Sequence, residues 1–508
     1  MQSFDMLMQG FAVALTPTNL LFIFIGVLLG QIIGALPGIG PSAGMALLLP
    51  VTYGMPPATA LMMLAGIMYG GMYGGTLTSV LINVPGEAAS VMTAVDGHQL
   101  ARQGRAGAAL SIAAVGSFIA GVGAVIAVMF AATALSAFAL RFSSPEYFLL
   151  ATLGITATAS LGSGSAVKAL LVAVFGLIIA LVGTDPITGI NRLTFGSVDL
   201  LEGIDFLPVA IGIFGIAEVL VSLEQTTDLE PMKTRLRDLW PRLKDWTECR
   251  MAILRGSVIG FIVGVMPGAG PTIAALVAYV AEKRFSMHPE RFGKGALDGL
   301  AACESANNSA VTGALVPMLA LGIPGSASTA VLLAALILLG VRPGPMLMTE
   351  QPQLVWGLIA SMYIGNVILL VMNLPLAPLF ASMLRIPYAF LAPGILVLSL
   401  VGAYATTLSL FTVVVTLAFG FIGYLMIKAD LPRAPLVLAL VLAPLMESSL
   451  RQSMMMSEGT LNIFFERPIA LVLLVGVVLS LVWPMIRAAR SAIRPKPAAR
   501  DEHAVDPV

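Results

Sequence analysis

The chain contains 508 residues, of which 58% are hydrophobic and only 11% are charged. Charged residues make up about a quarter of an ordinary soluble domain, so this composition excludes a soluble globular protein. It predicts an all-α polytopic protein that crosses a membrane many times. The formal net charge is zero, which gives no reason to expect a partner nucleic acid.

The charges are unevenly distributed along the chain. No Lys or Arg precedes Arg102, whereas basic residues are frequent in the segments 233–255 and 487–500. Because basic residues concentrate in cytoplasmic loops, we place the segment 224–255 and the C-terminus inside the cell. The N-terminus has no basic region before its first apolar stretch, so we expect that stretch to be retained.

A helix needs about 20 mainly apolar residues to span a bilayer, and the chain offers about ten to twelve such crossings plus re-entrant segments. Uninterrupted candidates cover residues 109–139, 166–183, 206–223, 354–376, 408–427 and 468–486, the last predicted transmembrane helix. Candidates that are shorter or interrupted by Gly and Pro cover 20–36, 42–50, 56–75, 76–92, 145–160, 251–266, 271–281, 305–338, 388–404 and 434–446. The polar stretch 224–250 is predicted to be a cytoplasmic connecting loop, with a short helix at the membrane surface as the alternative. Residues 487–508 are predicted to form a disordered cytoplasmic tail.

Two short motifs occur twice at nearly constant spacing. Residues 34–41 read GALPGIGP and residues 264–271 read GVMPGAGP, at an offset of 230. Residues 83–90 read NVPGEAAS and residues 322–329 read GIPGSAST, at an offset of 239. Ordered matches of this kind indicate an internal duplication, with repeats at about 20–223 and 251–446. We predict two repeats of opposite membrane orientation, because duplicated, interrupted segments are typical of transporters built in this way.

The repeated motifs combine proline, which stops a helix, with glycine, which permits positive φ and close approach to the backbone. Unpaired backbone groups are costly in hydrocarbon, so such breaks must face protein, water or a ligand. Helix N-termini suit a carboxylate and exposed carbonyl groups suit a cation. A kinked helix packed on small residues is the structural alternative. We predict that the four breaks converge and bind substrate through Pro37, Gly38, Gly40, Pro41, Asn83, Pro85, Gly86, Glu87, Ser90, Pro267, Gly268, Gly270, Pro271, Pro324, Gly325 and Ser326.

Polar residues that a lipid-facing helix would not carry lie between the breaks, and Glu304 precedes the densest group of them. Amide and hydroxyl oxygens are hard ligands of the kind that alkali cations accept, and ionisable residues at membrane depth are candidates for function. Hydrogen bonding between helices is the alternative explanation. We predict cation binding by Asn307, Asn308, Ser309 and Thr312.

These motifs resemble the large membrane subunit of the tripartite tricarboxylate transporter family over about residues 17–440. The resemblance rests on GALPGIGPSAGMALLLP, on GGMYGGTLTSVLINVPGEAASVMTAVDGHQLARQGRAG, and on GVMPGAGP followed by ESANNSAVTGALVPMLALGIPGSASTAVLLAAL. It implies a secondary carrier of small di- or tricarboxylates, such as citrate, in the bacterial inner membrane, generally driven by a cation gradient. It also implies two partners, a small membrane subunit and a periplasmic substrate-binding protein.

The anion expected as substrate poses a charge problem, because no Lys or Arg lies within the four breaks. The nearest candidates in the sequence are Arg102, Arg105 and Arg342, and each helix N-terminus contributes only about half a unit of positive charge. A co-bound sodium ion or proton would close the gap, so we expect cation coupling and no other cofactor.

Two other functional classes are possible on the residues alone. A channel or passive pore for small anions is the main alternative, although channels usually use rings of charge or carbonyl groups from symmetric subunits. An intramembrane enzyme is not expected. Residues 40–44 match the G-x-S-x-G pattern, but Pro41 and the membrane flanks do not fit its strand–turn–helix context. Cys249 and Cys303 form no metal-ligand cluster.

Overall fold

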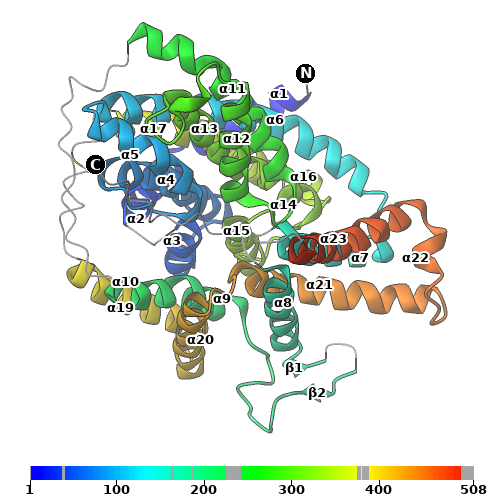
Figure 1. Ribbon diagram of the computed structural model, residues 1–508. Coiled ribbons are helices and arrows are strands. Elements are labelled where there is room, and N and C mark those ends of the chain that lie inside the picture. Colours follow the sequence, from blue (N-terminus) through cyan, green and yellow to red (C-terminus); the bar gives the residue numbers. More distant parts are fainter. Residues whose placement is uncertain are drawn as a thin grey trace, which may run out of the picture.

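The computed structural model describes residues 2–36, 40–161, 165–185, 188–224, 242–374, 379 and 388–493, and this part of the chain is almost entirely helical (Figure 1). The first half contains α1 (Gln2–Ala14), α2 (Pro17–Gly34), α3 (Pro41–Leu48), η1 (Leu49–Thr52), α4 (Pro57–Ile82), η2 (Ala88–Ser90), α5 (Val91–Arg102), α6 (Ala106–Ala139), α7 (Ser144–Leu161), α8 (Ala166–Ala180), the strands β1 (Gly183–Thr184) and β2 (Asn191–Arg192), α9 (Phe206–Ala210), the π-helix η3 (Ile211–Ile216) and α10 (Ala217–Glu224). The second half contains α11 (Leu243–Val265), α12 (Gly270–Phe285), η5 (Pro289–Arg291), α13 (Leu297–Gly313), α14 (Leu315–Leu321), α15 (Ala327–Leu338), α16 (Leu347–Glu350), α17 (Pro352–Asn373), α19 (Tyr388–Thr407), α20 (Leu410–Lys428), α21 (Ala434–Met456), α22 (Ile463–Glu466) and α23 (Pro468–Ile493).

The helices confirm an all-α polytopic membrane protein. Within the described residues, seven helical segments are long and apolar enough to cross a membrane, and six shorter apolar helices accompany them. The seven are Pro17–Gly34, Pro57–Ile82, Ala106–Ala139, Phe206–Glu224, Pro352–Asn373, Leu410–Lys428 and Ala434–Met456. All residues from Thr59 to Leu81 of α4 are buried within the protein, so α4 lies at the centre of the core.

Two helix pairs pack through glycines in the same way. In α2, a Cβ added to Gly26, Gly30 or Gly34 would lie 2.0–2.4 Å from a backbone oxygen of α4. In α11, a Cβ added to Gly256, Gly260 or Gly264 would lie 2.3–2.4 Å from a backbone oxygen of α13. The facing residues are Met63, Ile67 and Gly71 in α4, and Ala302, Ala306 and Ala310 in α13. The offsets between the copies are 230 and 239, as for the break motifs, which supports the duplication. The opposite orientation of the repeats stays a prediction.

This close packing gives a direct prediction for stability. Gly260→Ala is expected to lower the unfolding temperature, because its Cβ would lie 2.3 Å from the backbone oxygen of Ala306. Relief of this contact requires the backbones of α11 and α13 to move apart, which loses packing. Overpacking of this kind costs about 1–3 kcal/mol. Gly123→Ala in α6 is the control, because nothing lies within 4 Å of its added Cβ. Equal melting temperatures for the two purified variants would show that the contact does not constrain the helices.

Several element boundaries differ from those expected. The glycine-rich stretch within 57–82 does not interrupt the helix, because α4 packs its glycines against α2. Helix α11 begins at Leu243, so the end of the polar stretch 224–250 forms its first turns, and residues 225–241 lie outside the described residues. Helix α23 continues to Ile493, and the remainder of the predicted tail, 494–508, also lies outside them.

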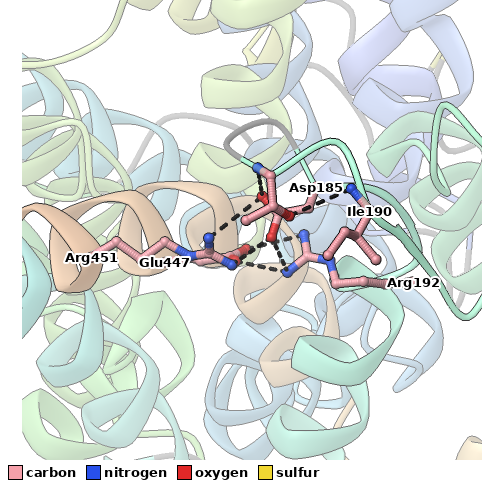
Figure 2. A network of polar contacts seen from close by, with 6 residues as sticks. Asp185, Ile190, Arg192, Glu447 and Arg451 are labelled. Atoms are coloured by element: carbon pink, nitrogen blue, oxygen red, sulfur yellow. Dashed lines mark hydrogen bonds and ion pairs between the residues drawn. The ribbon is translucent and has the colours of Figure 1, made fainter.

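A short hairpin of β1 and β2 extends from the helical body in Figure 1. An ion-pair network fixes it to α21 (Figure 2). Arg451 contacts Asp185 and Glu447, both at 2.7 Å, and Arg192 contacts Glu447 at 2.7 Å. These ion pairs therefore hold the hairpin against the C-terminal half of α21.

Candidate functional site

Residues of all four breaks line one cavity of about 650 Å³. This volume lies within the range of small-molecule sites, about 300–1,000 Å³. The predicted binding residues in its wall are Gly40, Pro41, Pro85, Gly86, Glu87, Gly268, Gly270, Pro271, Pro324 and Ser326. Asn83, Ser90, Pro267 and Gly325 are not among the lining residues, and Pro37 and Gly38 lie outside the described residues. The cavity brings the two copies together, while the binding role of its residues stays a prediction.

The second break of each copy has the same local geometry. Asn83 ends α4 with φ 58°, and Gly322 ends α14 with φ 72°, both in the left-handed region. The hydroxyl of Ser90 accepts from the Glu87 N–H at 3.3 Å, and the hydroxyl of Thr329 accepts from the Ser326 N–H at 2.8 Å. Each position differs from its counterpart by the offset of 239. In both copies, therefore, a left-handed residue ends the first helix, and a hydroxyl group accepts from the backbone N–H three residues before it, where the next helical segment begins.

The first break of the second copy contacts the second break directly. The Gly268 N–H donates to the Gly325 carbonyl at 3.1 Å. Gly268 has φ +84°, and an added Cβ would lie 2.3 Å from the Thr158 Cα atom in α7. Only glycine satisfies both constraints here. In the first copy, Pro41 occupies the start of α3, where its missing N–H costs no hydrogen bond.

The cavity also contains charged side chains that lie far from the breaks in the sequence. Arg433, which directly precedes α21, donates to Glu218 at 2.7 Å and to the Ile213 carbonyl at 3.1 Å. Its guanidinium lies 5.7 Å from the ring centroid of Phe214. The side chains of Arg433 and Glu218 are 25% and 13% exposed, and both residues line the cavity, so the ion pair is partly accessible from it.

Arg433 corrects the sequence-based expectation about the nearest positive charge. Arg102, Arg105 and Arg342 do not line the cavity, and Arg105 instead pairs with Asp245 at 2.7 Å. A local signal for Arg433 did exist: it lies between Pro432 and Pro435, in a short connection between two apolar helices. Its neighbours Glu218, Phe214 and Ile213 come from the α9–η3–α10 span, and that long-range contact leaves no mark in the sequence.

The π-helical turn η3 supplies part of this site. Gly212 packs so closely on α20 that an added Cβ would lie 2.5 Å from the Thr416 carbonyl oxygen. Single π turns within α-helices are rare, and those that occur often lie at functional sites. Here the turn presents the Ile213 carbonyl to Arg433 and the Phe214 ring to its guanidinium.

The four residues predicted to bind a cation do not line the cavity, and all are buried in α13. Asn308 donates to Ser117 at 2.8 Å and to the Asn307 side-chain oxygen at 2.7 Å. Ser309 donates to the Ser257 carbonyl in α11 at 2.7 Å, and Thr312 to the Asn308 carbonyl at 3.2 Å. Ser309 therefore joins two helices, whereas Asn307 and Asn308 belong to a polar cluster around Glu304.

Taken together, these features define a multi-pass membrane protein with an interior cavity built from paired helix breaks. Residues 20–438 match the tripartite tricarboxylate transporter TctA family, and the chain belongs to this family of membrane transporter subunits. The family is the large subunit of a three-part transporter, which implies partner subunits.

Two relatives from Agrobacterium vitis are similar to the chain. An uncharacterized 52.8 kDa protein in the TAR-I ttuC' 3' region is 46% identical over 488 residues, covering 95% of this chain and 97% of the relative. An uncharacterized protein in the TAR-II ttuC' 3' region is 42% identical over 238 residues, covering 46% of this chain and 98% of the relative. No solved structure matches the chain.

Proposed function

We propose that the chain is the carrier subunit of a secondary active transporter that moves a small di- or tricarboxylate across the bacterial inner membrane. It works with a small membrane subunit, takes its substrate from a periplasmic binding protein, and is driven by a sodium or proton gradient. The observation that supports this most strongly is the meeting of all four breaks, two from each copy, at one cavity.

The cavity wall suits a carboxylate. Three helices begin at it, since Pro41, Gly270 and Ala327 are the first residues of α3, α12 and α15. Helix N-termini carry partial positive charge and free N–H groups, which attract anions. Arg433 adds a full charge and a planar donor fork that matches a carboxylate.

Charge balance supports cation coupling. Arg433 is the single basic side chain among the described lining residues, and Glu218, Glu87 and Asp430 line the same cavity. An anion with two or three charges would therefore remain under-neutralised without a second source of positive charge. A co-bound sodium ion or proton supplies it, and substrate uptake then depends on that ion's gradient.

The experiment uses the three proteins together in vesicles, with radiolabelled citrate and a panel of dicarboxylates as probes. A carrier gives saturable uptake and counterflow, in which unlabelled substrate inside drives transient accumulation of label. A passive pore gives neither, because its flux grows with concentration and stops at equilibrium. Saturable counterflow supports the proposal, and unsaturable flux without counterflow overturns it.

A further inference from the structure

The carboxyl group of Glu304 is buried among helices α4, α5, α6 and α13. Glu304 lies in α13 and is 1% exposed. Thr76 of α4 donates to its Oε2 at 2.8 Å, and Thr93 of α5 donates to its Oε1. Ser117 of α6 lies 3.5 Å from Oε2, and Asn307 lies 3.4 Å from Oε1. Four helices thus bring polar side chains to one acid that does not line the substrate cavity.

No basic side chain contacts this acid in the described part of the chain. The ionisable groups close enough to interact with its charge are Tyr73 of α4, Cys303 of α13 and Glu87 at the cavity wall. Helix α6 carries no ionisable residue. Four other ionisable groups on neighbouring helices have partners elsewhere: Asp96 with Tyr279, His98 with the Val80 carbonyl, Asp245 with Arg105, and Arg255 with Glu282. The buried Tyr69 hydroxyl of α4 has no hydrogen-bond partner among the described residues.

A carboxylate without a counter-charge is costly in such an interior, and a bound proton removes that cost. The surrounding hydroxyl groups suit both states, because a hydroxyl can donate and accept. They donate to the ionised group. When one carboxylate oxygen takes up a proton, the new O–H donates to the Thr76 or Thr93 oxygen, and that hydroxyl hydrogen turns to another acceptor.

Space favours a proton over a metal cation. The Thr76 and Thr93 hydroxyls touch the carboxylate directly, so the cluster encloses no room for an ion and its oxygen ligands. The nearby hollow beside Tyr73 and Thr76 holds about 10 Å³, and Glu304 is not among its lining residues. That volume is about one water molecule's probe sphere.

Two adjacent residues of α4 link the acid to the substrate cavity. A Cβ added to Gly75 would lie 3.1 Å from the Glu87 Cγ, while the next residue, Thr76, contacts Glu304. No described group hydrogen-bonds the buried Oε1 of Glu87. An anion that binds beside Glu87 makes negative charge on Glu87 and Glu304 less favourable. Substrate binding therefore favours protonation of Glu304, and protonation of Glu304 favours substrate binding.

We propose that Glu304 is the proton-binding residue that couples carboxylate movement to the proton gradient. This rests on the proposed carrier function. It assigns coupling to a carboxyl group within α13, with Asn307 and the three hydroxyl residues as positioning residues around it.

The first test is infrared spectroscopy of the purified subunit, which needs no substrate. The wild type should show a buried carboxylic-acid C=O band that disappears as pH rises. Glu304→Gln should remove this band, whereas Glu87→Gln should leave it in place. Thr93→Val removes a donor to the ionised form, so the band should persist to higher pH, and Thr93→Ser should restore the original titration. An unchanged band in Glu304→Gln overturns the proposal.

The second test uses vesicles containing all three proteins, with labelled citrate. Glu304→Gln should keep counterflow but lose accumulation driven by an imposed pH gradient, and exposed Glu290→Gln should keep both. Gradient-driven accumulation by Glu304→Gln at the wild-type level contradicts the assignment, as does wild-type accumulation that responds to sodium alone. If Glu304→Gln does not fold, the comparison of Thr93→Val with Thr93→Ser tests the proposal instead. A band that disappears at the wild-type pH in Thr93→Val overturns it. Absence of counterflow in the wild type would instead reject the carrier function itself.

Discussion

Arg433→Gln is expected to raise the substrate concentration for half-maximal uptake by about 10- to 100-fold. Hydrogen bonds to charged groups contribute about 1.5–3 kcal/mol, and each 1.4 kcal/mol is a tenfold change in affinity. Arg433→Lys should give an intermediate loss, because an ammonium keeps the charge but not the planar pair of donors. The measurement is initial uptake of labelled citrate into vesicles across a range of concentrations.

The matched control is Arg342→Gln, because Arg342 is exposed and does not line the cavity although it follows the second break pair in the sequence. It should leave uptake unchanged. Removing Arg433 also leaves Glu218 without its 2.7 Å partner in a mostly buried position. The double variant Arg433→Gln with Glu218→Gln separates this effect: it should recover stability without recovering substrate affinity. Equal affinity in Arg433→Gln and Arg342→Gln would remove Arg433 from the site.

Asp96→Ala is expected to lower the stability of the protein strongly. Its Oδ1 accepts from the backbone N–H groups of Gly293, Gly295 and Ala296 at 2.8–2.9 Å, and its Oδ2 accepts from Tyr279 at 2.7 Å. The side chain is fully buried, so alanine would leave four donors unsatisfied. One buried unsatisfied group costs about 1–3 kcal/mol, so the total is on the order of 3 kcal/mol or more.

Thermal unfolding of the purified protein measures this effect, with Asp96→Asn as the control. Asparagine keeps one oxygen for the three N–H groups, and its amide can donate to the Tyr279 oxygen, so the loss should be smaller. The contacts hold the segment between α12 and α13 against α5, which also carries Thr93. Unfolding of Asp96→Ala at the wild-type temperature would show that these hydrogen bonds contribute little.

The parts of the site that the sequence predicted are those made by local chemistry. Closely spaced proline and glycine act locally to end or begin a helix, so Pro41 at the start of α3 and Gly268 with its positive φ were visible in the motifs. The predicted duplication doubled the signal, and the offsets of 230 and 239 recur in the glycine packing of α2 and α11. The fold class could be predicted from composition, because the preference of a segment for lipid over water depends on the types of its residues.

The parts that the sequence missed depend on long-range packing. Arg433 meets Glu218 only because α20 packs on η3, and nothing local to either residue predicts that contact. The continuity of α4 across residues 75 and 76, between two predicted spans, was also missed: its glycines, whose four-residue spacing favours close helix packing, lie against α2 without interrupting the helix. Likewise, Asn307 and Asn308 were visible as unusual polar residues, but their position around Glu304 required Ser117 of α6.

A transported carboxylate is expected to bind in the cavity formed by the four breaks and to protect a thiol placed there. Ala88 is an exposed lining residue beside Glu87, and the native Cys249 and Cys303 are buried, so Ala88→Cys should be the reactive thiol. The control is Met287→Cys, at a 92% exposed position outside the lining.

The measurement is the rate at which a water-soluble maleimide labels each variant with and without citrate or another transported carboxylate. The transported anion should slow labelling of Ala88→Cys, whereas a monocarboxylate that is not transported should not, and Met287→Cys should label at one rate throughout. Labelling of Ala88→Cys at an unchanged rate in saturating transported substrate would show that the carboxylate binds elsewhere, because the cavity would then be empty while the carrier is occupied.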